Sequence, residues 1–470
     1  MVFSSLIFLF AYLPITLTIY FAVPVRWRNL VLFFVSLFFY GWGEPITVFL
    51  MLFSITAAYG FGFLIEKYRE IDTRKSKNMM LLSVAVSLSL LLFFKYYNFF
   101  ATNLSRLPFL FVPTIPNLRL PIGISFYTFQ IISYTIDLYR RDCSLQKNYV
   151  SFGTYVTLFP QLIAGPIVRY SDVDDQLARR RESIADFSNG IGRFCCGLAK
   201  KILVGDSLAA GYRYFDALSD FTPTAIGGWM TIILYTLHLY YDFSGYSDMA
   251  IGLGRMFGFR FPENFNYPYI SKSITEFWRR WHITLSTWFR EYVYIPLGGN
   301  RQGRYKTYRN LAIVWLLTGF WHGAGWNFIF WGVYYAILLI VEKAWFLNVL
   351  EKCPLLVRHL YTLVLVVIGF LIFSHTDLMR MYRCFLSLFG IGCEGISHPV
   401  VRYQVLRLLP LCLISAIGST PLPHRVWMAI SQNMPKSTAF LRPFLTILAF
   451  LLCVSYLVDS TFSPFAYLQF

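Results

Sequence analysis

The chain has 470 residues, of which 57% are hydrophobic, 19% aromatic and only 14% charged. This composition, with a mean hydropathy of +0.54, excludes a soluble globular surface, intrinsic disorder and a small secreted disulfide scaffold. We therefore predict an all-α, polytopic membrane protein in which aromatic side chains form belts at the interfaces.

The 41 Lys and Arg residues outnumber the 24 Asp and Glu residues and give a formal charge of +17. Such an excess can indicate nucleic-acid binding, but here the basic residues concentrate in short segments between apolar stretches. This distribution is typical of cytoplasmic loops that face anionic lipid. We expect membrane lipids as partners, and no nucleic acid.

The eight cysteines occur singly apart from Cys195 and Cys196, without the spacing of a zinc site or a disulfide framework. No metal site is expected. The stretch from Val2 to Val23 lacks a basic n-region and a cleavage site, so we interpret it as a transmembrane helix rather than a signal peptide.

Apolar stretches that could span a membrane follow one another along the first third of the chain. They are Phe3 to Val23, Leu30 to Trp42, Ile46 to Ile65, Met79 to Tyr97 and Pro121 to Tyr139. The basic loops beside them lie at residues 26–28, 66–78 and 140–147. If these loops are cytoplasmic, the amino terminus is extracytoplasmic.

The alternation of sides becomes irregular at Tyr149 to Val168, which ends in a further basic segment. Pro160, Gly165 and Pro166 favour a re-entrant pair of short helices buried within the protein. Six further apolar stretches follow: Ile226 to Tyr241, Asn310 to Phe320, Asn327 to Val341, His359 to Ser374, Arg402 to Ile417 and Leu441 to Leu457. Several are too short to span, which is typical of helices that line a cavity or funnel. Without a repeat or a long linker, residues 1–470 are expected to form one domain.

The segment from Ser271 to Pro296 is too polar to span a membrane, yet its pattern is helical. Trp278, Trp281, Leu285, Trp288 and Tyr292 share one face, and Thr275, Arg279, His282 and Ser286 share another. We predict an amphipathic helix at the membrane interface. A simple surface helix with an incidental His282, bonded to a backbone carbonyl, is the alternative.

His322 is the histidine that the sequence places deepest in the membrane. A helix starting near Asn310, after the basic loop Arg301 to Arg309, would carry His322 roughly 18 Å from its start, near the bilayer midplane. An ionisable group there is a functional candidate, although a structural histidine between helices is possible. Gly323 and Gly325 next to it permit a break or close helix packing.

A neutral histidine can take the proton of a hydroxyl as that hydroxyl attacks an acyl carbonyl. A second histidine could orient the acyl donor or stabilise developing negative charge. His238 and Asp242 are spaced i and i+4 and could pair on a helix face, where mutual hydrogen bonding is favoured over catalysis. For Lys200 and Lys201, followed by Asp206, snorkelling at an interface is the favoured interpretation.

Five segments together resemble a known family. They are GPIVRYSDV (165–173), GLAKKILVGD (197–206), YDFSGYSDMAIGLGRMFGF (241–259), NFNYPYISKSITEFWRRWHITLSTWFREYVYIPLGGNR (264–301) and TGFWHGAGWNFIFWG (318–332). The chain resembles the membrane-bound O-acyltransferases, in particular the bacterial alginate O-acetyltransferase branch. The motif-rich part, about 120–345, would be the catalytic core.

The resemblance implies a helical shell around a thin centre, with a cytoplasmic funnel for the acyl donor and an outer funnel for the acceptor. It makes His322 the essential histidine and His282 the second histidine of the site. The remaining candidates for the donor tunnel and site are Trp278, Arg279, Trp281, Ser286, Trp288, Trp321, Asn327, His238 and Asp242.

The function implied is acyltransfer, with acetyl-coenzyme A or another activated acyl carrier as donor substrate and no bound cofactor. An acetyl group would cross the bacterial inner membrane for O-acetylation of an extracytoplasmic polysaccharide, completed by an SGNH-type partner. The related D-alanyl transfer proteins of teichoic acid modification share the RWH and WHG cores and are the alternative. A transporter is the rival from another class, but no paired halves with matching broken helices occur.

Overall fold

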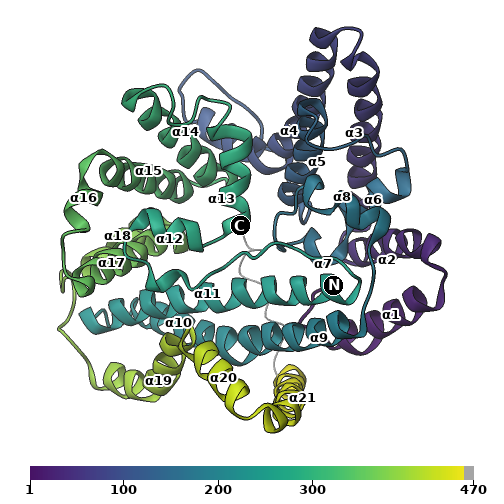
Figure 1. Ribbon diagram of the computed structural model, residues 1–470. Helices are drawn as coiled ribbons and strands as arrows, with labels where there is room; N and C mark the ends of the chain where they lie inside the picture. Colours follow the sequence, from purple (N-terminus) through teal and green to yellow (C-terminus); the bar gives the residue numbers. More distant parts are fainter. Residues whose placement is uncertain (460–470) are drawn as a thin grey trace. The chain divides into compact units, whose positions relative to one another are not determined.

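The computed structural model describes residues 1–459, and all regular elements within that range are helices (Figure 1). The prediction of an all-helical protein is confirmed. In chain order the elements are η1 (Phe8–Tyr12), α1 (Leu13–Ala22), η2 (Val25–Trp27), α2 (Arg28–Gly43), α3 (Thr47–Arg69), α4 (Thr73–Leu104), α5 (Ile124–Arg140), α6 (Tyr149–Thr157), α7 (Phe159–Leu162), α8 (Tyr170–Arg179), α9 (Ile184–Ala199), η3 (Lys200–Gly205), α10 (Asp206–Leu218), α11 (Ala225–Met256), η4 (Pro268–Ile270), α12 (Ile274–Arg280), α13 (Ile283–Phe289), η5 (Arg290–Tyr294), α14 (Arg304–His322), α15 (Trp326–Val341), η6 (Glu342–Phe346), α16 (Leu347–Leu350), α17 (Leu355–Ser374), α18 (Leu378–Ser387), α19 (Pro399–Gly418), α20 (Leu422–Asn433) and α21 (Pro435–Asp459).

The helices form two compact units. The first comprises Met1–Phe194 and Ser247–Pro262, and the second comprises Cys195–Tyr246 and the chain from Glu263 onward. The single-domain prediction is not tested by this division. In the first unit α3 and α4 pack as a long antiparallel pair (Figure 1). Both candidate histidines lie in the second unit.

Six helical stretches within residues 1–459 are long and apolar enough to cross a membrane. They are Thr47–Arg69, Thr73–Leu104, Trp326–Leu350, Leu355–Ser374, Pro399–Gly418 and Pro435–Asp459. Large apolar side chains on these helices are exposed, as expected for contact with lipid. The protein is therefore a multi-pass membrane protein.

Two of the predicted spans have a different character. The stretch Leu30 to Trp42 lies in α2, which has only 16 residues. The stretch Pro121 to Tyr139 lies in α5, whose side chains are nearly all buried, including the polar Gln130 and Asp137. α5 is thus a helix of the protein core rather than one that faces lipid, because its polar and apolar positions alike are covered by neighbouring helices.

The predicted break between Tyr149 and Val168 is confirmed. α6 ends at Thr157, Leu158 has a non-helical backbone, and the short α7 has Pro160 in its first turn. Proline favours this position because the first turn requires no partner for its missing N–H. Residues 163–169 are not helical and are largely buried. The membrane depth of this segment stays a prediction.

Two glycines let α14 and α15 pack closely. A Cβ on Gly319 would lie 2.3 Å from the Phe328 carbonyl oxygen, and one on Gly332 would lie 2.6 Å from the Trp315 carbonyl oxygen. The two helices are joined by Gly323 and Gly325, whose extended backbones end α14 and begin α15. Both predicted uses of glycine, a break and close packing, occur in this hairpin, which carries His322.

Candidate active site

His282 lies at a break between two short helices. α12 ends at Arg280, Trp281 is extended, and His282 has a left-handed backbone (φ 45°, ψ 53°) before α13 begins. A non-glycine residue rarely adopts this conformation, which is often retained at functional sites. The predicted continuous amphipathic helix from Ser271 to Pro296 is therefore wrong.

The break arises because the loop Asn264–Asn266 competes for the backbone of residues 280–283. Asn266 N–H donates to the Arg280 carbonyl oxygen at 2.9 Å, and Ile283 N–H donates to the Asn264 carbonyl oxygen at 3.0 Å. Phe265 and Trp281 form an isolated antiparallel bridge. The aromatic face predicted to lie at a membrane interface is instead buried within the protein.

Asn264 fixes the tautomer of His282. Its side-chain oxygen accepts from the Thr284 N–H (3.3 Å) and hydroxyl (2.9 Å), and it lies 3.1 Å from His282 Nδ1. Because this atom accepts from an amide, it is the carbonyl oxygen, so Nδ1 must carry a proton. The other nitrogen, Nε2, is left as an acceptor.

Burial keeps the His282 ring neutral. The residue is 1% exposed and lies outside the six long apolar helices. Desolvation lowers the pKa of His282 from its ordinary value of 6.5 to about 3. A neutral ring with Nδ1–H fixed can accept a hydrogen bond at Nε2 but cannot donate one there. His282 is suited to orienting a donor group rather than to stabilising negative charge.

His322 is the last residue of α14 and is buried among aromatic rings. Its ring centroid lies 5.0 Å from those of Trp321 and Trp331 and 5.1 Å from that of Phe373. α14 begins at Arg304, six residues before the apolar run, so His322 lies roughly 27 Å along the helix rather than 18 Å.

Trp321 connects the two histidines. Its ring centroid lies 6.2 Å from that of His282 and 5.0 Å from that of His322. The sequence separates the histidines by 40 residues, and the fold brings both against one indole. The prediction that His282, His322 and Trp321 belong to one site is consistent with this arrangement.

A group of aromatic side chains, the aromatic box, continues from His322. Trp278 packs edge-on against Trp315 (4.6 Å), Tyr335 (4.9 Å) and Trp331 (5.4 Å), and Trp331 contacts His322. The Nε1 atoms of Trp278 and Trp331 and the hydroxyl of Tyr335 are buried without a hydrogen-bond partner in the described part of the chain. Buried polar groups are normally paired, so three such donors together indicate a place for a polar ligand.

Two members of the aromatic box, Trp278 and Trp315, also line a cavity of about 260 Å³, which we call the Trp278 cavity. Its apolar walls come from Trp278, Leu285, Phe289, Val314, Trp315 and Leu339. Three exposed cations, Arg279, Arg290 and Lys343, also line it. Arg290 pairs with Glu291 at 2.8 Å, whereas Arg279 and Lys343 have no ion pair within residues 1–459. An apolar cavity with cations around it suits a ligand with an apolar arm and an anionic end.

A buried carboxylate holds the helix that contributes Trp278 and Arg279. Glu342 is 1% exposed and accepts from the N–H groups of Ile274 (2.7 Å) and Thr275 (2.8 Å) and from the Thr275 hydroxyl (2.6 Å). A carboxylate at a helix N-terminus satisfies free N–H groups and the helix dipole. Glu342 therefore fixes α12 beside the cavity.

Of the other predicted site residues, Ser286 lines the Trp278 cavity, whereas Trp281 and Trp288 do not. Ser286 lines the Trp278 cavity with Trp278 and Arg279, and its hydroxyl donates to the Trp278 carbonyl oxygen at 3.2 Å. Trp281 stacks on Phe277 and also packs on Phe370. Trp288 packs on Phe289 and Tyr292. Neither Trp281 nor Trp288 is among the residues that line the cavity.

Asn327 joins the start of α15 to the end of α17. Its side-chain N–H donates to the Phe373 carbonyl oxygen at 3.2 Å, close to the contact between Phe373 and His322. Its side-chain oxygen is buried without a hydrogen-bond partner in the described chain. Asn327 therefore lies near His322, and its place in the donor tunnel stays a prediction.

His238 and Asp242 do not pair with each other. His238 Nδ1 lies 3.0 Å from the Gly205 carbonyl oxygen, and Asp242 pairs with Lys201 at 2.8 Å. Lys201 is 2% exposed and also contacts Asp206 at 2.6 Å. The predicted bond between His238 and Asp242 is wrong, because α11 packs against the η3 segment and each side chain finds its partner there. The predicted snorkelling of Lys201 is also wrong, because this lysine is buried and a buried ammonium group requires carboxylate partners.

Sequence reasoning missed Asn264, Glu342, Trp315, Trp331 and Tyr335. Asn264 follows no helical period, and Glu342 acts on a helix 68 residues before it in the chain. The three aromatic residues lie in apolar stretches, where nothing distinguishes them from side chains that face lipid. Only the helix packing brings them together.

The membrane-spanning helices and the two buried histidines define a polytopic membrane protein with a candidate site in its second unit. The family model described as MBOAT, membrane-bound O-acyltransferase family, matches residues 120–385. The chain belongs to the membrane-bound O-acyltransferase family and is an acyltransferase.

Three relatives show its place within the family. The "Probable alginate O-acetylase AlgI" of Azotobacter vinelandii is 40% identical over 508 residues, covering 100% of both chains. The protein of the same description from Pseudomonas aeruginosa is 44% identical, covering 85% of this chain and 76% of its own. The "Peptidoglycan O-acetyltransferase" of Helicobacter pylori is 37% identical, covering 73% and 71%. The chain is thus similar to enzymes that O-acetylate polysaccharides, as the sequence motifs predicted.

Proposed function

We propose that the protein takes an acetyl group from a cytoplasmic donor and passes it across the bacterial inner membrane for O-acetylation of an extracytoplasmic polysaccharide, with His322 as the catalytic residue. The observation that carries the proposal is the continuous contact from the Trp278 cavity through Trp331 to His322. A donor in the cavity would be linked to the buried histidine through the rings of Trp278 and Trp331.

The distribution of charge supports this direction of transfer. The basic segment Arg301 to Arg309 includes the start of α14, which begins at Arg304, and Lys343, Lys352 and Arg358 lie around the connection from α15 to α17. The positive-inside rule assigns these ends to the cytoplasm. The same rule, applied to the basic loop 66–78, gives an extracytoplasmic amino terminus.

The donor assigned to the Trp278 cavity is an acyl thioester on a phosphopantetheine arm, in the first instance acetyl-coenzyme A. Arg279, Arg290 and Lys343 would bind its phosphates. The apolar walls suit the arm, and the Trp278 Nε1 and Tyr294 hydroxyl, both buried and without partners in the described chain, suit its amide oxygens. The acyl carbon would then reach the aromatic box.

In the reaction, His322 accepts the proton of the attacking hydroxyl as its oxygen bonds to the acyl carbon. The Trp331 N–H, beside His322, is a donor for the negative oxygen that develops on that carbon. The carbon–sulfur bond then breaks and the proton passes from His322 to the thiolate. His282 Nε2 accepts from the substrate and orients it. The products are an ester and a free thiol.

An extracytoplasmic SGNH-type partner would carry the acetyl group onward to the polysaccharide. This chain would be the membrane subunit that works with that partner. Similarity to O-acetylases over the whole chain favours acetyl over D-alanyl transfer. A transporter has less support, because a buried base linked to the cavity wall through Trp331 has no role in moving an intact solute.

The test uses membranes that contain the full chain and acetyl-coenzyme A labelled in the acetyl group. We expect His322→Ala to lose transfer to membrane-associated acceptors while the protein still inserts and folds. His424→Ala is the control, because His424 is exposed on α20 and should retain full activity. Wild-type transfer by His322→Ala would refute the role of His322. Labelling only from a D-alanyl carrier, or passage of uncleaved donor, would refute acetyl transfer.

A further inference from the structure

Glu342 joins the two segments that carry the cations of the Trp278 cavity. Lys343 follows it directly in η6. Its carboxylate accepts from the N–H groups of Ile274 and Thr275 at the start of α12, which carries Arg279 about one turn further on. Arg279 and Lys343 both line the cavity. One buried carboxylate therefore fixes the position of Arg279 relative to Lys343.

Uncharged groups occupy both oxygens of this carboxylate. Oε1 accepts from the Ile274 N–H, and Oε2 accepts from the N–H and the hydroxyl of Thr275. Glu342 is 1% exposed, and within residues 1–459 it forms no ion pair with Arg279 or Lys343. Because its oxygens are engaged by neutral donors, Glu342 holds the two cationic segments together without pairing with either cation.

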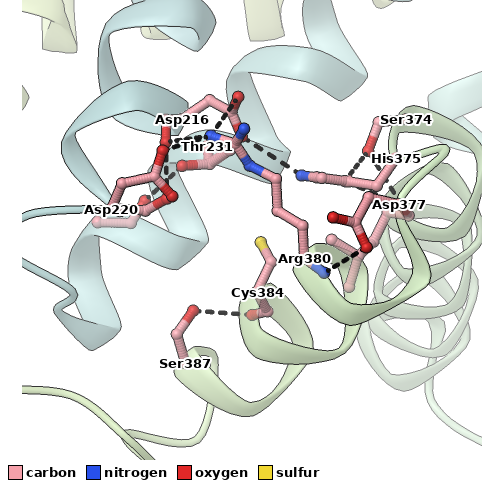
Figure 2. Close-up of polar contacts among 12 residues, drawn as sticks. Asp216, Asp220, Thr231, Ser374, His375, Asp377, Arg380, Cys384 and Ser387 are labelled. Carbon is pink, nitrogen blue, oxygen red and sulfur yellow. Dashed lines mark hydrogen bonds and ion pairs between the residues drawn. The ribbon is translucent and has the colours of Figure 1, made fainter.

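Arg380 on α18 shows the opposite arrangement (Figure 2). It lies 3.1 Å from carboxylate oxygens of both Asp216 and Asp220. A carboxylate that reaches a neighbouring guanidinium group pairs with it in this way and neutralises it. Arg380 is therefore not available to an external anion.

The Trp278 cavity keeps two cations for a ligand. Arg290 pairs with Glu291 at 2.8 Å, whereas Arg279 and Lys343 have no ion pair in the part of the chain that the structure describes. The diphosphate linkage of coenzyme A carries two negative charges, and the linkage through a single phosphodiester carries one. The charge of this pair of cations therefore matches a diphosphate.

From these observations we infer that Glu342 is a positioning residue for donor recognition, which holds Arg279 and Lys343 as a pair for the diphosphate of the donor. The inference rests on the proposed function, which assigns the donor to the Trp278 cavity. Each cation would bind one phosphate, and loss of the Glu342 hydrogen bonds would release the start of α12 and separate the pair. Glu342 would thus set the preference for a doubly charged donor without taking part in the chemistry at His322.

The test measures equilibrium binding of two probes to the full chain in lipid nanodiscs. Dephospho-coenzyme A contains the diphosphate, and the methyl phosphodiester of phosphopantetheine contains a single charged phosphate. We expect the wild-type protein to bind the diphosphate probe at least about tenfold more tightly, as for one additional charge-assisted hydrogen bond. A ratio of two affinities does not depend on the fraction of protein that is folded, so a purely structural role would not change it.

Glu342→Gln should lose most of this preference, because the amide nitrogen of glutamine cannot accept from the N–H groups of α12. Thr275→Val removes one of the three hydrogen bonds and should lose a smaller part. Asp377→Asn is the matched control, because Asp377 also accepts from N–H groups at the start of a helix but is exposed and does not line the cavity (Figure 2). It should keep the full preference.

The double variant Arg279→Gln, Lys343→Gln shows whether Glu342 acts through the two cations. It should lose the preference, and adding Glu342→Gln to it should have no further effect. A preference that persists in the double variant would assign it to the nucleoside of the probe and overturn the inference. A further loss in the triple variant would also overturn it.

Equal binding of the two probes by the wild-type protein, or full preference in Glu342→Gln, would overturn the inference as well. If neither probe binds, the proposed donor site is wrong and the inference falls with it. His322→Ala should keep the preference while losing transfer, so failure of the catalytic proposal and failure of this one give different results.

Discussion

Asn264 and His282 form the pair that determines the chemistry available at the second histidine. The Asn264 side-chain oxygen lies 3.1 Å from His282 Nδ1 and also accepts two hydrogen bonds from Thr284. The amide is therefore held in one orientation, and the imidazole is held in one tautomer. Asn264 thus sets which nitrogen of His282 is protonated and which can accept a hydrogen bond.

Asn264→Ala should lower kcat by about 10- to 100-fold, the range seen when residues that orient the histidine ligands of metal sites are removed. The released ring can rotate and change tautomer, while the Trp278 cavity is untouched, so KM for the donor should stay near the wild-type value. Steady-state transfer of labelled acetyl groups measures both. Asn266→Ala is the control, because Asn266 is exposed and its hydrogen bonds within residues 1–459 involve only its backbone. A purely structural role would lower the amount of folded protein and leave kcat of the remainder unchanged.

His282 also predicts how stability depends on pH. Its pKa is lowered by burial from 6.5 to about 3, so the folded protein resists protonation while the unfolded chain does not. The native state should therefore lose stability as pH falls from about 6.5 towards 3, with the full contribution present only above about 6.5. The expected measurement is the unfolding temperature in nanodiscs at pH 8 and pH 5.

His282→Gln should reduce that fall in the unfolding temperature, because glutamine does not titrate. His398→Gln is a suitable comparison, since His398 is a partly exposed residue at the start of α19. If the unfolding temperatures of the wild-type protein and His282→Gln fall equally with pH, the buried neutral His282 does not contribute to the loss of stability at low pH.

The cations of the Trp278 cavity predict a defect in donor binding. The double variant Arg279→Gln, Lys343→Gln should raise KM for acetyl-coenzyme A by about tenfold at low salt with little change in kcat, since phosphate contacts lie away from the reacting carbon. The difference from wild type should shrink as salt is raised. Lys352→Gln, an exposed lysine on the same connection, is the control and should leave KM unchanged. An unaltered KM in the double variant would mean that the donor phosphates bind at another place.

Several features of the fold could be predicted from local sequence. The apolar stretches at 46–65 and 79–97 correspond to α3 and α4, and the glycines around His322 end one helix and begin the next. These predictions hold because each depends on hydropathy or on one residue type. His322 and Trp321 are adjacent in sequence, so their proximity could be predicted without knowing how the helices pack.

The remaining parts of the site depend on contacts between distant segments. The pattern of residues 271–296 is helical, but hydrogen bonds between residues 280–283 and the loop at Asn264 break the helix. The periodicity of one segment cannot predict hydrogen bonds to another segment. The pairing of Asp242 with Lys201 rather than with His238 has the same origin. The spacing i, i+4 permits a contact, whereas the neighbouring helix decides which contact forms.

The close approach of α14 and α15 predicts a packing defect from the smallest possible change. Gly319→Ala places a methyl group 2.3 Å from the Phe328 carbonyl oxygen, so the helices must separate, at a cost of about 1–3 kcal/mol typical of overpacking. The shift would also move His322, three residues away on α14, and should lower both the unfolding temperature and kcat. Gly60→Ala in α3 is the matched control, because no atom lies within 4 Å of its added Cβ and alanine favours the helix. Equal stability of both variants would show that the hairpin tolerates a wider separation than its glycines indicate.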